Sequence, residues 1–358
     1  MIEKALKGNR PYWIWIISLL SVIAFGISAY AQQMRLGLSV TGLGVDASLG
    51  LSFMQYSFMA ALSASSVLVM LPFFLHDYKP LGKIAVIAQF LAVSAAATAL
   101  LFLFVDMGKP HLIFDLLRYA TPHSLYSWAF LLLNAFLFIN LASSWATLGA
   151  ERKDVPAATW VKSLNYLSIP FAISIPVVTG LSSTTFPADS GTLSLLAPRF
   201  LLSAFAAGSA LLLLIVLILK RTAAFDAGKE VTSQLVLFLV YAGSLNFLFS
   251  GINCFTCTSQ AAPILLLSLL LGIASIAVLL APKLISSTNW LAAAAAGVVL
   301  AIWMEKSVAL LHAPMGGIAA YTPTSTELSI TLGVCAFGLL LFTMLLKVAV
   351  SVKAVNER

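Results

Sequence analysis

Six ionisable side chains lie close together between two long apolar runs of the chain. Residues 106–123 include two acids, two bases and two histidines: Asp106, Asp115, Lys109, Arg118, His111 and His123. Carboxylates and imidazoles exchange protons with a bound substrate when their pKa values suit the working pH. Ionisable groups at a membrane are costly and for that reason usually functional. A solvated Gly-Pro loop is the alternative, and these residues alone leave both interpretations open.

Two further candidates lie at the ends of other apolar runs. Arg199 follows a proline at the start of one run, and a planar guanidinium suits anionic or carbonyl oxygens. Its alternative role is an anchor at the membrane interface. Glu305 precedes Lys306 near the end of another run. These two charges can form a surface pair, or a buried Glu305 can carry a proton.

The composition places these residues in a membrane protein. Of 358 residues, 61% are hydrophobic and 9% are charged, whereas a soluble domain carries about 25% charge. The apolar runs are long and do not alternate, which predicts helices and not barrel strands. We expect an all-α fold in one integral membrane domain over residues 1–358, with about ten transmembrane helices in two bundles. The expected spans are 12–34, 53–75, 83–105, 124–148, 163–183, 197–219, 231–253, 262–281, 289–311 and 327–350.

The basic residues predict the orientation of these spans. If the N-terminus is cytoplasmic, most of the 20 Lys and Arg residues lie on the cytoplasmic side. Only five lie on the opposite side: Arg35, Lys109, Arg118, Arg199 and Lys306. This distribution satisfies the positive-inside rule and predicts that both termini are cytoplasmic. The candidate residues named above then gather at the outer face.

Pro170 and Pro176 predict an irregular fifth span.

Several classes of cofactor and partner are disfavoured by the composition. The four histidines lie at span ends, which is a poor arrangement for haem ligation across helices. Three cysteines are too few for an iron–sulfur cluster, and the pair Cys254 and Cys257 lacks two ligands for structural zinc. The net charge of +7 does not indicate nucleic-acid binding, because the basic residues form no stripe. We expect neither haem nor metal in this chain.

Short motifs along the chain resemble those of a known membrane-protein family, the NrfD/PsrC-like membrane subunits of polysulfide reductase. The matching strings are D-M-G-K-P at 106–110, S-L-Y-S-W at 124–128, A-P-R-F-L-L-S-A-F at 197–205, W-M-E-K at 303–306 and Y-T-P-T-S-T-E at 321–327. The last two are similar to the ten-span branch that includes DsrP, the Hmc-type subunits and the membrane subunits of alternative complex III. The resemblance covers about residues 53–350, leaving 1–52 as a first span and an outer loop.

The resemblance implies a haem-free subunit that binds a quinone, menaquinone or ubiquinone, near the outer face. It also implies an iron–sulfur, ferredoxin-like partner docked there, with a multihaem cytochrome c and other membrane subunits as further partners. The location would be a prokaryotic inner membrane, crossed many times. On this basis the expected catalytic residues are Asp106, His111, His123 and Glu305. The expected quinone-binding residues are Arg199, Tyr126, Trp128 and Lys109.

Two other functions stay open at this point. A membrane anchor without quinone turnover is favoured by Pro176, which stands where that branch often has a histidine. A secondary transporter would require paired broken helices in two related halves of the chain. The two prolines of the fifth span have no convincing counterpart in the other half.

Overall fold

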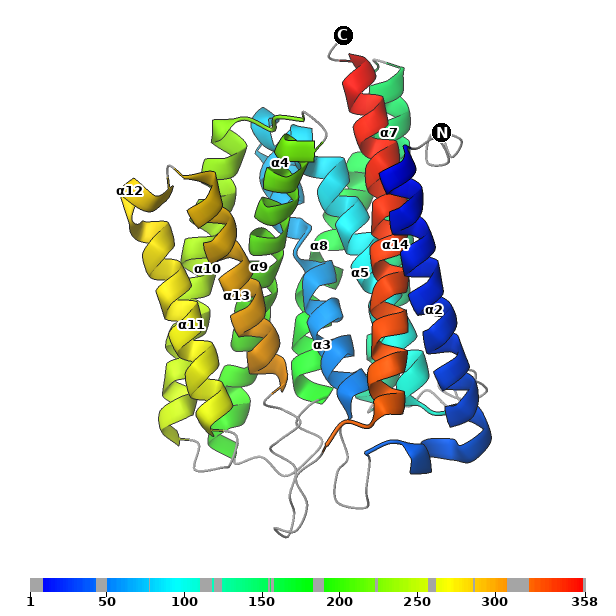
Figure 1. Ribbon diagram of the computed structural model, residues 1–358. Coiled ribbons are helices and arrows are strands. Elements are labelled where there is room, and N and C mark those ends of the chain that lie inside the picture. Colours follow the sequence, from blue (N-terminus) through cyan, green and yellow to red (C-terminus); the bar gives the residue numbers. More distant parts are fainter. Residues whose placement is uncertain are drawn as a thin grey trace.

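The computed structural model describes residues 9–42, 50–76, 78–109, 118, 124–153, 155, 158–182, 190–222, 225–256, 262–285, 287–307 and 322–356 (Figure 1). In these residues the regular structure is helical, and ten helical segments are long and apolar enough to cross a membrane. The main helices are α2 (Arg10–Leu36), α3 (Leu51–Ala64), α4 (Val67–Leu75), α5 (Gly82–Asp106), α7 (Leu125–Arg152), α8 (Thr159–Ser182), α9 (Ser190–Thr222), α10 (Lys229–Thr256), α11 (Ala262–Leu280), α13 (Thr288–Ser307) and α14 (Ser325–Asn356). Short pieces are η1 (Gly37–Val40), η2 (Lys79–Leu81) and α12 (Pro282–Ile285). The expected all-α fold and its ten spans are confirmed.

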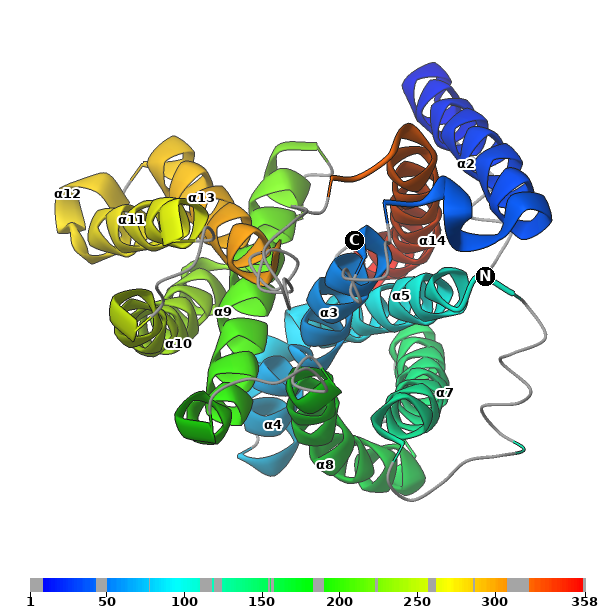
Figure 2. The same ribbon diagram turned by 90° about the horizontal axis from the view of Figure 1, so that it is seen from below.

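The helices form two bundles and one additional pair (Figure 2). In the first bundle α3 packs on α5 and α8, and α7 closes the group by contacting both α5 and α8. In the second bundle α9 contacts α10 and α13, while α11 lies between those two helices. The pair α2 and α14 packs on α5. Helix α3 also contacts α9, α13 and α14, so it lies at the centre of the molecule.

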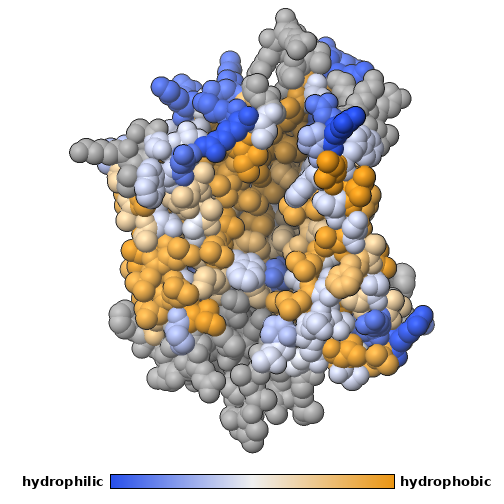
Figure 3. Space-filling model, viewed as in Figure 1, coloured by the Kyte–Doolittle hydropathy of each residue, from blue (hydrophilic) through white to orange (hydrophobic). Residues whose placement is uncertain are grey.

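Large apolar side chains cover the outer surface of the helices, which would contact lipid. Ile14, Phe138 and Leu332 are each more than half exposed although they belong to spans. Figure 3 shows hydrophobic residues over the middle of the molecule and many hydrophilic ones along its upper end. In lipid an apolar outer surface carries no penalty, and the backbone must be satisfied internally.

Helix ends explain some of the residues in the motifs at 106–110 and 124–128. Ser124 is the N-cap of α7, because its hydroxyl accepts a hydrogen bond from the Ser127 amide (3.3 Å). The Ser127 hydroxyl in turn bonds to the Ser124 hydroxyl (2.9 Å). At the end of α5 the chain turns at Gly108, whose φ of +71° is a conformation that favours glycine. Both the serine pair and the glycine therefore have a structural role in this fold.

The carboxylate of Glu327 ties the start of α14 to the end of the first span. It accepts hydrogen bonds from the amides of Thr324 (2.9 Å) and Gly42 (3.0 Å). The Glu327 amide donates back to the Thr324 hydroxyl (3.3 Å), which completes a capping box. Higher up, a Cβ on Gly26 would lie 2.6 Å from the Gly333 Cα, so α2 and α14 touch through their backbones. The first span is thus fixed to the last one.

The break in the helices falls in the second span and not in the fifth. Helix α8 is continuous, with Pro170 and Pro176 inside it. The second span instead divides after Ala64 into α3 and α4. At this break a Cβ on Gly208 would lie 1.8 Å from the Ser65 Cβ, so α9 presses directly on the junction. The interruption is therefore packed against a neighbouring helix.

The order of the helices sorts their ends into an upper and a lower set as drawn in Figure 1. Helices α5, α10 and α13 begin at the upper end, whereas α3, α7, α9 and α14 begin at the lower end. The described candidate residues consequently all lie toward the lower end: Asp106, Lys109, Tyr126, Trp128, Arg199 and Glu305. This agrees with their expected gathering on one side; which side of the membrane it faces stays a prediction.

Candidate functional site

A buried ion pair joins α9 and α13, two helices of the second bundle. The Arg199 Nε lies 2.9 Å from Glu305 Oε1. The second carboxylate oxygen, Oε2, accepts a hydrogen bond from the side-chain amide of Asn246 on α10 (2.8 Å). The Glu305 side chain is only 2% exposed. Three helices therefore meet at one carboxylate, with both of its oxygens in use.

Lys306 is buried beside this pair but does not join it. Its ammonium lies 3.2 Å from the centroid of the Phe200 ring, a cation–π contact. The residue is 4% exposed, and its Nζ has no hydrogen-bond partner among the residues that the structure describes. Neighbouring residues on a helix are about 100° apart, so Glu305 faces Arg199 while Lys306 faces Phe200. The adjacent charges of the motif are thus buried and have different partners.

Two more buried polar atoms near the ion pair lack partners in the described part of the chain. They are the Asn246 Oδ1 and the hydroxyl of Ser250. Ser250 follows Asn246 by one helical turn, so both lie on one face of α10. Buried polar atoms without partners are rare and usually mark a bound water, an ion or a functional site. Together with Lys306 they supply two donors and one acceptor that a polar ligand can use.

Asp106 belongs to a second group, in the first bundle. Its carboxylate lies within electrostatic range of the hydroxyl groups of Tyr126 on α7 and Tyr56 on α3. The Tyr56 hydroxyl is 3.3 Å from the Thr179 hydroxyl on α8. Because Thr179 already donates to the Ile175 carbonyl (2.7 Å), its oxygen can accept from Tyr56. Four helices contribute to this group.

The two groups approach each other where α8 packs on α9. The ring of Phe53 lies 5.6 Å from that of Tyr56 and 6.1 Å from that of Tyr126. Gly180, next to Thr179, is so close to Phe200 that a Cβ there would lie 3.0 Å from the Phe200 ring. The Asp106 group and the Arg199–Glu305 pair are therefore neighbours across the contact of α8 with α9, and together they form a band of aromatic and polar residues at the lower end. We call it the lower-end band.

The remaining predicted site residues are placed as follows. Lys109 is exposed, and Trp128 is 47% exposed. Trp128 follows Tyr126 by two residues, about 200° around α7, so the two rings point to opposite sides of this helix. Of these two aromatic residues, Tyr126 lies in the lower-end band and Trp128 does not. His111 and His123 lie outside the described residues, and so do Tyr321 and His312.

Residues that the sequence interpretation did not single out complete the band. Asn246 was missed, although an amide inside an otherwise apolar span is itself a signal of function or polar packing. Tyr56 and Thr179 were missed because tyrosine and threonine are common in membrane helices. Lys306 was visible in the motif W-M-E-K, but its burial without a hydrogen bond depends on the packing of α13 on α9.

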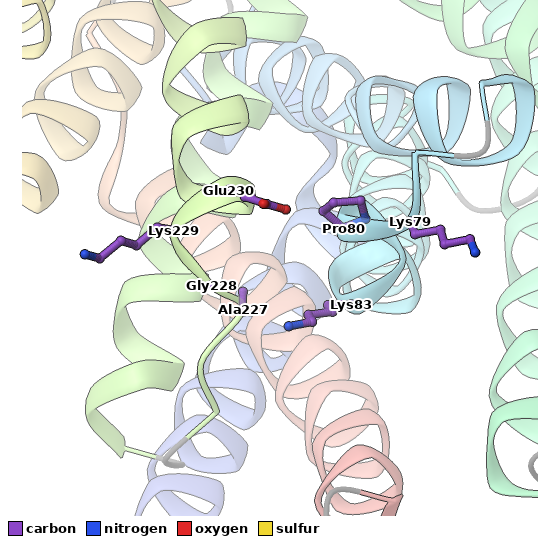
Figure 4. Close-up of a pocket in the computed structure, with 7 residues that line it drawn as sticks. All are labelled: Lys79, Pro80, Lys83, Ala227, Gly228, Lys229 and Glu230. Atoms are coloured by element: carbon purple, nitrogen blue, oxygen red, sulfur yellow. The ribbon is translucent and has the colours of Figure 1, made fainter.

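A cavity at the opposite, upper end has a different character (Figure 4). It measures about 500 Å³ and lies between η2 and the start of α10. Its lining residues are Lys79, Pro80, Lys83, Ala227, Gly228, Lys229 and Glu230. Lys83 points toward Gly228, whereas Lys79 and Lys229 point outward on opposite sides. Exposed lysines at a span end suit a membrane surface, and none of the lining residues is a predicted site residue.

The acid beside this cavity is exposed. Asp226 lies 2.9 Å from the Lys220 ammonium, and its other oxygen accepts from the Gly228 amide (3.0 Å). The hydrogen bond from Lys220, followed by that from Gly228, holds the pKa of the Asp226 carboxyl below its ordinary value. Such an exposed pair stays ionised in water and contributes little to stability. This exposed pair therefore differs from the buried Arg199–Glu305 pair of the lower-end band.

Comparison with known families agrees with the motifs. The family described as polysulphide reductase, NrfD, matches residues 39–350, which is most of the chain. The chain belongs to the NrfD family. The NrfD match begins in η1, earlier than the expected residue 53, and ends within α14. It therefore includes both bundles and the whole lower-end band.

Three curated relatives of the chain have names that give redox roles. The chain is 23% identical to a selenate reductase subunit of Mesobacillus selenatarsenatis, over 57% of this chain and 55% of that one. It is 27% identical to a putative dimethyl sulfoxide reductase membrane subunit of Halobacterium salinarum, over 62% and 54%. It is 26% identical to an Hdr-like menaquinol oxidoreductase integral membrane subunit of Archaeoglobus fulgidus, over 59% and 52%. The chain spans about half the length of these relatives.

Proposed function

We propose that this protein is the membrane subunit of a multi-subunit oxidoreductase complex and that it binds a quinone in the lower-end band. The observation that carries the proposal is the set of buried polar atoms without partners, Lys306 Nζ, Asn246 Oδ1 and Ser250 Oγ, around the Arg199–Glu305 pair. Relatives named as reductase and menaquinol oxidoreductase subunits support it. Membership of the NrfD family supports it further.

The available atoms fit the oxygens of a quinone or quinol. Lys306 and the Ser250 hydroxyl can donate to a carbonyl oxygen, and Asn246 Oδ1 can accept from a quinol hydroxyl. Arg199 keeps 14% of its side chain exposed, whereas Glu305 keeps only 2%. The Phe200 ring, over which the Lys306 ammonium lies, adds an aromatic side chain to this site. A site lined by aromatic residues with a few convergent polar groups is typical of cofactor and substrate pockets.

The acids of the band would handle protons. A bound quinol would supply two electrons and two protons, and an iron–sulfur partner at the lower end would take the electrons. Asp106 is the proton acceptor that we propose, with Tyr126 beside it. Glu305, fixed by Arg199 and Asn246, would relay protons toward the lower surface. His111 and His123, adjacent in sequence to this region, stay candidates for the same path.

The first test measures quinone retained by the complex after purification through a tag on this chain. Lys306→Met removes a buried charge that has no hydrogen bond within the described residues, so we expect thermal stability to be unchanged or higher. If Lys306 donates to the quinone, the same variant lowers quinone affinity by about 10- to 100-fold. Improved stability with lost quinone cannot arise from misfolding, so this combination identifies a ligand-binding role.

Two further variants complete this experiment. Lys347→Met is the matched control, because Lys347 also lies over an aromatic ring, that of Tyr12 at 3.3 Å, but at the upper end. It should retain quinone fully. Asp106→Asn should retain quinone and lose quinol-dependent electron transfer, because the amide cannot accept the proton. Normal quinone content in Lys306→Met would remove this site from consideration, and normal turnover in Asp106→Asn would remove Asp106.

The partners and the location follow from the same proposal. An iron–sulfur, ferredoxin-like subunit would dock at the lower end, where the band comes closest to the surface. A multihaem cytochrome c and further membrane subunits would complete the complex. The chain is a multi-pass integral membrane protein. We propose a prokaryotic inner membrane, with the lower end on the outer side.

The transporter alternative finds less support in the helices. The second span is broken at Ser65, but α9, α10, α11 and α13 of the other bundle are continuous over their described lengths. Paired broken helices are the expected feature of a transporter. The break at Ser65 is also filled by α9 at Gly208. A membrane anchor without turnover is the alternative that the quinone measurement would decide.

A further inference from the structure

The central helix α3 reaches the surface along one narrow stripe. Nearly all of its residues are buried, and only Ser52 and Met59 are partly exposed. Gln55 lies between them on the same face, because the three residues follow each other at spacings of three and four. The Gln55 side chain itself is buried, with the residue 5% exposed. One face of the most central helix therefore opens outward although the molecule surrounds the rest.

This stripe lies where the two bundles meet. Met59 of α3, Phe205 of α9 and Trp303 of α13 each pack against both large apolar cores of the molecule. All three are only half-buried. Helices α13 and α14 each contact α3. Between α13 and α14, Figure 3 shows a long hollow in this face, lined mainly by hydrophobic residues.

The hollow has a polar end. The indole N–H of Trp303 donates to the side-chain oxygen of Gln55 (3.3 Å), which places an indole and an amide at the stripe. Gln55 is four residues from the lower start of α3, so this pair lies about 6 Å inside the helix ends. Lys306 follows Trp303 by one helical turn on the same side of α13. The apolar hollow therefore leads to the site proposed above for the quinone head group.

The shape and polarity select one kind of occupant. A phospholipid places its charged head group at the membrane surface, not below the helix ends beside an amide. An isoprenoid quinone combines a flat, uncharged head group with a long, flexible apolar tail. We propose that the hollow between α13 and α14 holds the isoprenoid tail of the quinone and is its path from the lipid to the lower-end band. This inference rests on the proposed function and adds the direction of access.

Photo-crosslinking identifies what occupies the hollow. A benzophenone amino acid is introduced at Met59 in the intact complex, and native membranes are illuminated before purification. Mass spectrometry of the Met59 peptide should then show an adduct with isoprenoid quinone. The control position is Ile27 on α2, which is 63% exposed and remote from the stripe, and should show phospholipid adducts only. Phospholipid or another polypeptide as the sole adduct at Met59 overturns the proposal.

Tail-length dependence gives an independent measurement. Menadione, which has no tail, and a long-tailed menaquinone are titrated against the purified wild-type complex and its Met59→Trp variant. The larger side chain fills the hollow, so affinity for the long-tailed quinone should fall by about tenfold while menadione affinity is unchanged. Met59→Leu keeps the volume and should behave as wild type. It also separates this effect from a general loss of packing.

The outcomes separate this inference from the function on which it rests. If the wild-type complex binds neither menadione nor menaquinone, the proposed function fails. If it binds both and Met59→Trp weakens them equally or not at all, quinone binding stands and the tail path is wrong.

Discussion

At the scale of single residues, the Glu305 carboxylate links three helices of the second bundle. It is bound by Arg199 from α9 and by Asn246 from α10. A buried pair gives little net stability when compared with an apolar pair, but removing one partner leaves an unpaired buried charge. Single and double substitutions of this pair therefore have different expected effects.

We expect Arg199→Ala alone to destabilise the complex more than the double variant with Glu305→Ala. The single change leaves a buried carboxylate unpaired, at a cost of about 3–5 kcal/mol, whereas the double change removes both charges. Thermal unfolding of the purified complex measures the difference. Glu305→Ala alone completes the cycle, and a loss in the double variant equal to the sum of the two single losses would show that the two side chains do not interact in the membrane.

The sequence predicts these residues but not their pairing. Arg199 and Glu305 stand out because ionisable groups are rare in spans, and each was expected to be functional. They are 106 positions apart, however, and the sequence offers Lys306 as the nearer partner for Glu305. The packing of α13 on α9 decides the pairing, and such packing is specified by side-chain shape over two helices.

At the scale of helices, the contact between α3–α4 and α9 has no room for one additional methyl group. The Cα of Gly208 faces the Ser65 side chain at the break in the second span. Small residues let membrane helices approach closely, and their packing replaces the hydrophobic effect, which is absent between helices in lipid. This contact joins the first bundle to the second.

Gly208→Ala should therefore reduce the yield of folded protein sharply, because the new Cβ would overlap Ser65. The matched control is Gly149→Ala in α7, where nothing lies within 4 Å of the added Cβ. That change should be neutral or stabilising by up to about 1 kcal/mol, since alanine favours helix. Size-exclusion profiles of the detergent-solubilised protein compare the two. A normal profile for Gly208→Ala would contradict the close contact.

The hydropathy pattern predicts the spans well, because a helix needs about 20 apolar residues to cross a bilayer. The hydropathy pattern does not predict the break between α3 and α4, since Ser65 and Ser66 carry no helix-breaking signal in the sequence. The prolines predict an irregular fifth span, but Pro170 and Pro176 lie inside a continuous α8. Neighbouring helices and side chains can satisfy the carbonyls that proline leaves free, and sequence alone does not show them.

At the scale of the whole molecule, a group of exposed lysines and a group of buried charges lie at opposite ends. Exposed lysines such as Lys79, Lys83 and Lys229 lie at the upper end, whereas the buried charges of Glu305 and Lys306 lie in the lower-end band. The positive-inside rule then predicts a cytoplasmic upper end and an outer lower end. Under the proposed function, this orientation determines the side on which the proposed iron–sulfur partner would dock.

Fusion reporters test the orientation. A fluorescent protein that folds only in the cytoplasm, attached after Arg358, should fluoresce. Alkaline phosphatase at the same place should be inactive, because it folds only outside the cytoplasm. Fusion after residue 42, at the end of the first span, should give the opposite result. Phosphatase activity at the C-terminus would place the lower-end band on the cytoplasmic side.

The hydrogen bond between Gln55 and Trp303 can form only late in the synthesis of the chain. Its two residues are 248 positions apart, so the amide of α3 enters the membrane long before the indole that binds it is made. Until α13 is inserted, the Gln55 amide at the centre of the molecule lacks its partner. The contacts between α13 and α9 are also missing at that stage. Completion of the core therefore reports that nearly the whole chain has been translated. A prematurely ended chain would keep an exposed amide, a feature by which a membrane protease can recognise it.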